Sequence, residues 1–178
     1  MGDFILIEAL EAQCAAQGEN TALVYQGRET SYQELSHTSN QVAQALLAEG
    51  IEPHARIGFM GANSDLYFQL LFGVQKARAV LVGVNSRLVG PEVAYVLNDA
   101  QTEMVFVGKD FVPLIESILA DCPSVKRVIA MDGEHDEWTA FDAWRDGAQA
   151  KHPKLDYQPQ DDFIQLYTSG TTGHPKGV

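Results

Sequence analysis

The residues with the clearest capacity for chemistry lie near the end of the chain, from residue 168 to residue 177. Three glycines, four hydroxyl side chains and one lysine are concentrated in these ten residues. Glycines let successive backbone N–H groups turn toward one anion, hydroxyl groups add hydrogen-bond donors, and lysine supplies a compact positive charge. This combination favours a loop that binds polyphosphate. The candidate binding residues are Thr168, Ser169, Gly170, Thr171, Thr172, Gly173 and Lys176.

The order of these residues differs from the Walker A phosphate loop, which requires Gly-Lys followed by Ser or Thr. Here Lys176 is preceded by Pro175 and followed by Gly177. Pro175 also biases His174 toward an extended conformation and so steers Lys176 away from a helix. By composition alone, a hairpin rich in glycine and threonine, with a surface lysine and no ligand, stays open as an alternative.

The elements upstream of this loop alternate between helix and strand. Strands that alternate with helices indicate parallel βαβ units. The predicted fold class is therefore α/β, with a mainly parallel sheet flanked by helices. Strands are expected at residues 56–60, 80–84, 104–107, 127–130 and 163–167, and helices at 65–77, from residue 91 and at about 111–119.

The N-terminal residues give the clearest signal for a single helix. Ser31 and Glu34 form the S-x-x-E pattern of a capping box ahead of apolar residues at helical spacing. Gly50 is placed to end this helix. A first helix from about residue 4 to Gly18 and a short hairpin within residues 22–31 are expected before it.

The sequence changes character between residues 131 and 160. This stretch is rich in charge, carries Pro153 and Pro159, and holds one short helix candidate at residues 141–148. Its acidic run, at residues 132–137, is more typical of a solvated loop than of a metal site. The predicted organisation is an α/β lobe over residues 1–130, an irregular connection over 131–160, and a strand with the phosphate-binding loop over 161–178.

Composition excludes several classes of protein. Twenty-four acidic residues against twelve basic ones give a net charge of −12, which repels a nucleic-acid backbone. The two cysteines, Cys14 and Cys122, indicate neither a zinc site nor a disulfide framework, so a reducing cytoplasm is the expected location. No transmembrane segment is expected, because the longest apolar run covers only residues 79–84. Peripheral attachment to a membrane stays open.

The string from Tyr167 to Val178, YTSGTTGHPKGV, resembles the signature phosphate loop of the adenylate-forming superfamily. This superfamily includes acyl-CoA synthetases, luciferases and the adenylation domains of nonribosomal peptide synthetases. Residues 30–35 resemble its T-Y-x-E-L box, and residues 75–88 resemble its K-A-G-A-V and N-P-R-L region. Arg78 stands where the family usually has glycine, and Gly83 and Ser86 stand where prolines are common. Arg78 therefore puts close packing in that turn in doubt.

The resemblance implies the N-terminal lobe of the large domain of an acyl-CoA synthetase-like ligase. Such an enzyme uses ATP with Mg²⁺ to convert a carboxylic acid to an acyl-adenylate and pyrophosphate, and then passes the acyl group to coenzyme A. The loop residues would grip the β- and γ-phosphates as binding residues. The catalytic lysine and the adenine, ribose and magnesium contacts are expected beyond Val178. Neither catalytic nor metal-ligating residues are expected before it, and the fragment alone is expected to be inactive.

The acid itself is not fixed by these residues. A fatty acid or similar apolar acid is the first expectation, because the upstream boxes look most like those of acyl-CoA synthetases. An aromatic-acid CoA ligase and an amino-acid adenylation domain are the alternatives within the superfamily. From a different class, a nucleotide-binding or interaction module without ligase activity also stays open. The sequence leaves the oligomeric state undetermined.

Overall fold

The computed structural model describes residues 5–168 and 175–178, which divide into two compact units. Each unit is assembled from separate stretches of the chain. The helical unit contains Met1–His54, Asn63–Ala79 and Arg145–Asp161, and the sheet unit contains Ala55–Ala62, Val80–Trp144 and Asp162–Val178. The division at residues 130 and 160 suggested by the sequence stays a prediction.

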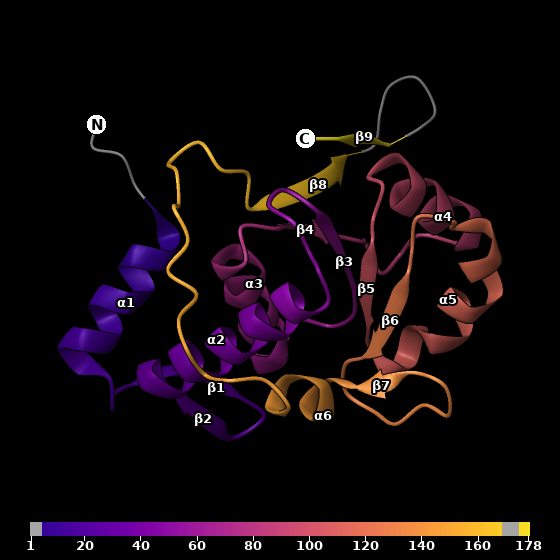
Figure 1. The fold of residues 1–178 in the computed structure, drawn as a ribbon. Coiled ribbons are helices and arrows are strands. Elements are labelled where there is room, and N and C mark those ends of the chain that lie inside the picture. Colours follow the sequence, from indigo (N-terminus) through magenta and orange to yellow (C-terminus); the bar gives the residue numbers. More distant parts are fainter. Residues whose placement is uncertain (1–4, 169–174) are drawn as a thin grey trace. The chain divides into compact units, whose positions relative to one another are not determined.

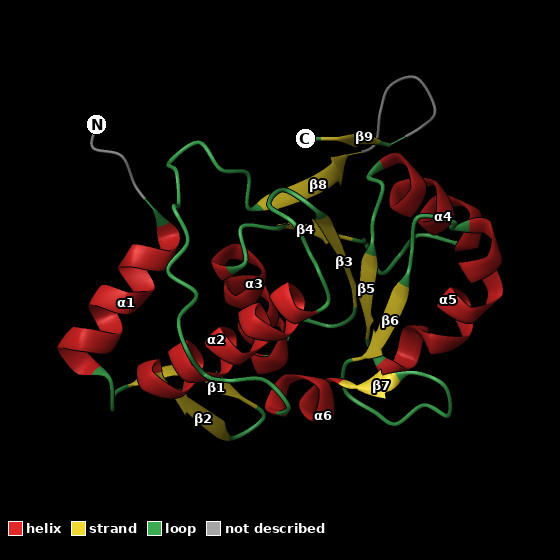
Figure 2. Cartoon of the chain, in the orientation of Figure 1, coloured by secondary structure: helices red, strands yellow, loops and turns green. Residues whose placement is uncertain are grey.

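The sheet unit is built on one mostly parallel sheet with the strand order β7-β6-β5-β3-β4-β8-β9 (Figure 1). Each neighbouring pair is parallel except β8 with β9, which is antiparallel. Helices and parallel strands alternate as expected, so the α/β class is confirmed (Figure 2). The strands are β3 Arg56–Met60, β4 Val80–Gly83, β5 Met104–Val107, β6 Arg127–Ala130, β7 Thr139–Ala140, β8 Ile164–Thr168 and β9 Lys176–Gly177.

The core of the sheet unit explains why the strand sequences are continuous apolar runs. All four residues of β5 are buried, and β3, β4 and β6 are buried over most of their length. Strands covered on both faces need apolar side chains at successive positions rather than at alternate ones. Helices α4 (Gly90–Asp99) and α5 (Val112–Ile118) contribute Val96, Leu97 and Ile115 to one core cluster with Val82 and Val105.

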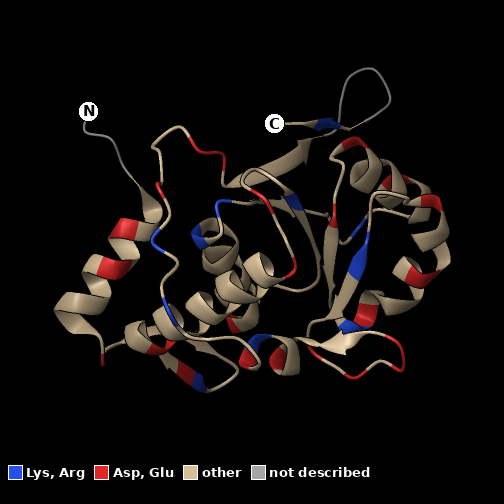
Figure 3. Ribbon diagram, in the orientation of Figure 1, with Lys and Arg blue, Asp and Glu red and all other residues tan. Residues whose placement is uncertain are grey.

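Short elements complete the sheet unit. The 3-10 turns η1 (Lys109–Phe111) and η2 (Leu119–Asp121) flank α5, which divides the single helix expected at about 111–119. Helix α6 (Phe141–Asp146) places Phe141 and Trp144 against Phe106, with ring centroids 6.0 and 5.2 Å away. The acidic run at residues 132–137 lies in the loop between β6 and β7, where Figure 3 draws Asp and Glu in red.

The helical unit contains α1 (Leu6–Gln17), the hairpin of β1 (Thr21–Tyr25) with β2 (Arg28–Ser31), α2 (Tyr32–Ala48) and α3 (Asp65–Lys76). The expected capping box at the start of α2 is present. The Glu34 backbone N–H donates to Ser31 Oγ at 3.2 Å, and the Ser31 N–H donates to Glu34 Oε2 at 2.8 Å. Gly73 lets α2 and α3 approach closely, because a Cβ at this position would overlap Val42.

A fully buried lysine joins the three helices of this unit. The Lys76 ammonium lies 2.7 Å from Glu11 Oε1 on α1 and donates to Asn40 Oδ1 on α2 at 2.8 Å. Burial lowers the pKa of Lys76, which the hydrogen bond to Glu11 opposes. Burial raises the pKa of Glu11, but the hydrogen bond and charge of Lys76 outweigh it, so the net shift is downward. The buried charge of Lys76 is thus compensated by the charge of Glu11.

The segment that closes the helical unit, Arg145–Asp161, is largely irregular. Side-chain amides of α2 donate to its backbone carbonyls, the shortest from Gln44 to Lys151 at 2.7 Å. Tyr157 donates its hydroxyl to the Lys76 carbonyl at 2.9 Å. Among residues 5–168 and 175–178, the structure contains no helix long and apolar enough to cross a bilayer.

Candidate functional site

The candidate phosphate loop connects the two antiparallel strands β8 and β9 of the sheet unit. Thr168 at the end of β8 and Lys176 at the start of β9 are direct partners in this ladder, and Tyr167 is paired with Gly177. Beyond this pair, Leu166 and Val178 exchange both backbone hydrogen bonds, at 3.0 and 2.8 Å. The structure thus brings together the first and the last of the predicted binding residues.

The other predicted binding residues, Ser169, Gly170, Thr171, Thr172 and Gly173, lie outside the described residues. Their phosphate-binding role stays a prediction, as does that of Thr168 and Lys176. What the structure adds is the hairpin stem on which such a loop is mounted. Both Thr168 and Lys176 are exposed to solvent there.

The position of the stem in the sheet is favourable for binding a ligand. Strand β8 runs parallel to β4, with Leu81, Val82 and Gly83 opposite Ile164, Gln165 and Leu166. Thr168 is therefore at the carboxyl end of a parallel strand. Open α/β sheets bind ligands in crevices beyond the carboxyl ends of their strands. The carboxyl end of β8 thus lies at the edge of the sheet where this fold class places ligands (Figure 1).

A chain of hydrogen bonds holds β8 just before the loop. The Tyr167 hydroxyl donates to Asp99 Oδ2 at 2.6 Å. Gln165 lies two residues earlier, on the same face of β8, and its Nε2 donates to the Tyr167 oxygen at 3.4 Å. Arg56 Nε donates to Gln165 Oε1 at 3.3 Å. Sequence reasoning missed this chain, because its members are separated by as many as 109 positions.

The environment of Tyr167 keeps its hydroxyl protonated. Burial raises the pKa of Tyr167, and the hydrogen bond to the Asp99 carboxylate raises it further. The ring also packs against the core cluster that includes Val96 and Leu97 of α4. Tyr167 therefore remains a hydrogen-bond donor to Asp99 throughout the neutral and mildly alkaline range.

Comparison with protein families identifies the chain. The family model described as "AMP-binding enzyme" matches residues 10–178, which include the hairpin and nearly all of both units. The chain belongs to the AMP-binding enzyme family. This confirms the resemblance seen in the phosphate-loop motif, and the members of this family with known activities include acid–CoA ligases.

Relatives of this AMP-binding chain include two ligases that are named for fatty acids. It is 40% identical over 166 residues to the fatty acid–acyl-carrier-protein ligase ScoC of Streptomyces coeruleorubidus, covering 92% of this chain and 30% of that protein. It is 32% identical over 151 residues to the long-chain-fatty-acid–CoA ligase FadD13 of Mycobacterium tuberculosis, covering 83% of this chain and 29% of that protein. The chain thus spans about 30% of the length of these relatives.

Solved structures agree with this assignment. The anthranilate CoA ligase AuaEII in complex with anthranoyl-AMP superposes with a TM-score of 0.93 at 28% identity, covering 100% of this chain and 35% of that one. The inhibitor-bound N-terminal domain of FACL13 from Mycobacterium tuberculosis gives a TM-score of 0.85 at 29% identity, covering 97% of this chain and 43% of that one. The two units therefore have the fold of the N-terminal region of such ligases.

One departure from the family pattern has a clear structural setting. Arg78 of the AMP-binding chain has a φ of 56°, in the left-handed region that glycine adopts more readily than other residues. Its guanidinium binds Asp161 in a bidentate manner, with two contacts of 2.9 Å. This hydrogen bonding lowers the pKa of Asp161. The neighbouring Ala77 and Ala79 remain buried, so the turn packs closely around the arginine's backbone.

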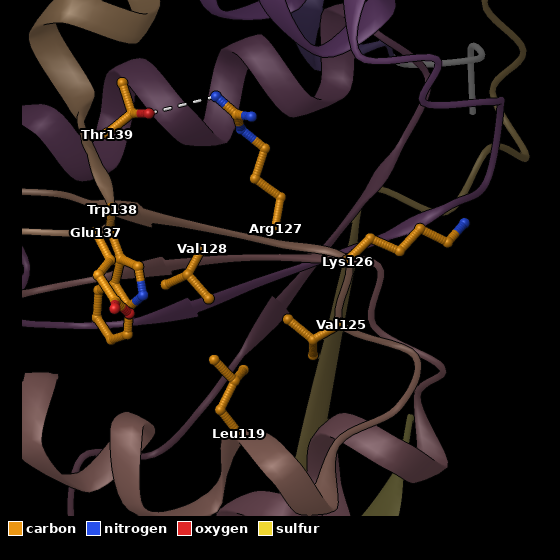
Figure 4. A pocket seen from close by; sticks show the side chains of 8 residues that line it. All are labelled: Leu119, Val125, Lys126, Arg127, Val128, Glu137, Trp138 and Thr139. Atoms are coloured by element: carbon orange, nitrogen blue, oxygen red, sulfur yellow. Dashed lines mark hydrogen bonds between the residues drawn. The ribbon is translucent and has the colours of Figure 1, made fainter.

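A separate pocket of about 290 Å³ lies in the sheet unit of this AMP-binding chain (Figure 4). It is lined by side chains from the loop before β6, from β6 and from the approach to β7, including Val125, Val128 and Trp138. Arg127 and Thr139 also line it, and the Arg127 guanidinium donates to Thr139 Oγ1 at 3.4 Å. Neither Thr168 nor Lys176, the two predicted phosphate-binding residues that the structure describes, lines this pocket. Among the described residues, no group of three or more His, Cys, Asp or Glu is arranged to hold a metal ion.

Proposed function

We propose that the polypeptide containing this chain activates a carboxylic acid with ATP. The acid attacks the α-phosphorus, an acyl-adenylate forms, and pyrophosphate leaves. The acyl group then passes to the thiol of coenzyme A, and AMP is released. The observation that supports this most is the hairpin stem, which pairs Thr168 with Lys176 on either side of a glycine-rich and hydroxyl-rich connection.

The residues of this chain act by binding phosphate oxygens. The hydroxyl groups of Thr168, Ser169, Thr171 and Thr172 and the backbone N–H groups at Gly170 and Gly173 supply donors, and Lys176 supplies charge. Negative charge grows on the departing pyrophosphate, so a lysine beside it stabilises the transition state more than the ground state. Mg²⁺, the adenosine and the catalytic lysine are proposed to be held or supplied by residues outside this chain, and the chain by itself is proposed to be inactive.

The proposed acid is a fatty acid or a similar apolar acid. Similarity to ScoC and FadD13, whose names specify fatty acids, supports this choice. Aromatic acids are one alternative, supported by 30% identity over 163 residues to a 3-hydroxybenzoate–CoA/4-hydroxybenzoate–CoA ligase of Thauera aromatica. An amino acid is another alternative, supported by 31% identity over 171 residues to tyrocidine synthase 1 of Brevibacillus parabrevis.

A second candidate for the acyl acceptor follows from one relative. ScoC is named as a ligase to an acyl-carrier protein and is 40% identical to this chain over 166 residues. A thiol carried on a protein is therefore the alternative to coenzyme A. Nucleic acid is not a proposed partner, because the net charge of −12 would repel it. The proposed location is the cytoplasm.

An exchange assay on the full-length polypeptide tests the first half-reaction. Acid-dependent exchange of labelled pyrophosphate into ATP is expected with medium-chain and long-chain fatty acids, and weaker exchange with hydroxybenzoate, anthranilate or phenylalanine. Adding either coenzyme A or a phosphopantetheinylated carrier protein then identifies the acceptor by thioester formation. Absence of exchange with every acid would contradict the proposal and favour a nucleotide-binding or interaction module without ligase activity.

A further inference from the structure

Gly177, which directly follows Lys176, lies under two side chains of the opposite strand. A Cβ built on Gly177 would overlap Gln165 Nε2 and would lie 3.1 Å from Cζ and 3.2 Å from the hydroxyl oxygen of Tyr167. Real Cβ atoms rarely come so close to other atoms, so only glycine fits without a shift of these side chains. Tyr167 therefore rests directly on the backbone of β9, one residue from the lysine that carries the charge.

Asp99, the partner of Tyr167, occupies an unfavourable place for a carboxylate. It is the last residue of α4, where the helix dipole presents its negative end. A carboxylate there destabilises a helix when it is exposed, as Asp99 is. Helix stability alone therefore does not account for this residue. The hydrogen bond of 2.6 Å from Tyr167 gives it a different role.

We propose that Tyr167 is a positioning residue for the phosphate-binding hairpin. Its hydroxyl is held by Asp99 and its ring packs against β9, which keeps β9 in register with β8 and so keeps Lys176 opposite Thr168. The inference rests on the proposed function of the loop. Asp99 accepts the hydrogen bond from the Tyr167 hydroxyl, and the ring of Tyr167 packs against the core cluster. The ring also lies beside the backbone of Gly177. Holding Lys176 in a fixed position matters because a displacement of about 1 Å in an active site can slow a reaction about a hundredfold.

Gln165 supports the same arrangement from the side. Its amide contacts the Tyr167 oxygen at 3.4 Å and is itself held by Arg56 at 3.3 Å. Because Gln165 and Tyr167 are two residues apart on β8, both project over the same stretch of β9. The anchor is thus two-sided: Asp99 holds the tyrosine from α4, and the Arg56–Gln165 pair holds it from β3 and β8.

The test uses the full-length polypeptide and two variants, Tyr167→Phe and Asp99→Asn. Tyr167→Phe removes the hydroxyl and keeps the ring. Asp99→Asn weakens the same hydrogen bond but also removes the unfavourable charge at the end of α4, so its thermal midpoint should equal or exceed that of the wild type. Single-turnover adenylation is expected to slow roughly tenfold in each variant. Thioester formation from supplied acyl-adenylate should change less than twofold, because pyrophosphate has already left.

Tyr157→Phe is the matched control. Tyr157 also donates its hydroxyl to a single acceptor, the Lys76 carbonyl at 2.9 Å, and burial raises its pKa to about 12. It belongs to the helical unit, whereas β8 and β9 belong to the sheet unit. This variant is expected to lower the thermal midpoint while adenylation by the folded enzyme stays within about twofold of wild type. Adenylation by the double variant Tyr167→Phe/Asp99→Asn should be no slower than adenylation by Tyr167→Phe, because both changes act on the same hydrogen bond between Tyr167 and Asp99.

Two results would overturn the inference. The first is unchanged adenylation in Tyr167→Phe and Asp99→Asn while the wild type is active. The second is an equal loss in both half-reactions, which would indicate a general structural defect instead of a role in positioning the hairpin. Absence of acid-dependent pyrophosphate exchange in the wild type is a distinct outcome, because it removes the proposed function itself.

Discussion

Removing the charge of Lys176 is the most informative single change in this chain. The lysine is exposed on β9, opposite Thr168, and its ammonium is proposed to lie beside the departing pyrophosphate. At a separation of about 4 Å, one pair of unit charges interacts by about 1 kcal/mol in bulk water and about 4 kcal/mol at the effective dielectric constant typical of a protein surface. With about 1.4 kcal/mol for each factor of ten in rate, Lys176→Ala in the full-length enzyme should slow adenylation by about fivefold to about a thousandfold. The solvent exposure of Lys176 favours the lower part of this range, about tenfold to a hundredfold.

Separate single-turnover measurements of the two half-reactions check this expectation. Thioester formation from supplied acyl-adenylate should be nearly unaffected in Lys176→Ala, because the pyrophosphate has gone. Lys151→Ala is the control, since Lys151 is also an exposed lysine and its loss changes the net charge equally. Unchanged adenylation, or a defect confined to thioester formation, would refute the assignment of Lys176 as a phosphate contact. The role of the loop would then rest on its glycines and hydroxyl groups.

Three further predictions concern stability and use equilibrium unfolding in urea. Thr102 is fully buried and its Oγ1 has no hydrogen-bond partner among the described residues, so Thr102→Val should raise the free energy of unfolding by about 1 kcal/mol; a clear loss would reveal a hidden partner. Gly73→Ala places a methyl group into Val42 and should destabilise the protein by about 1–3 kcal/mol, whereas an unchanged midpoint would mean that α2 and α3 separate easily. The lowered pKa of Glu11 means that its ion pair with Lys76 stabilises the fold above the ordinary glutamate pKa, and that this contribution disappears as the pH falls through the lowered value. Glu11→Gln should therefore flatten the acid side of the stability profile, and a profile identical to wild type would contradict the pairing.

The sequence was sufficient for the elements that depend on local patterns. The strands at residues 56–60, 104–107 and 127–130 match β3, β5 and β6 because strands buried on both faces need unbroken apolar runs. Helix α2 begins after Ser31 as expected, because its capping box depends on two residues three positions apart. The motif around Lys176 likewise identified the family, which the match over residues 10–178 confirms.

What the sequence did not reveal depends on contacts between distant positions. Tyr167 and Asp99 are 68 residues apart, and neither has a local pattern that points to the other. The same holds for Arg78 and Asp161, which are 83 residues apart. Each compact unit likewise combines three stretches that are separate in the sequence. Such interleaving arises from packing and leaves little trace in composition.

The fate of one oxygen atom tests the central claim most directly. The full-length enzyme would be supplied with ATP, coenzyme A and a fatty acid whose carboxylate oxygens are ¹⁸O, and the nucleotide products would be analysed by mass spectrometry. Attack of the carboxylate on the α-phosphorus followed by thiolysis leaves one carboxylate oxygen on AMP, so AMP carrying a single ¹⁸O is the predicted product. ADP together with labelled inorganic phosphate, or AMP without label, would contradict activation through an acyl-adenylate.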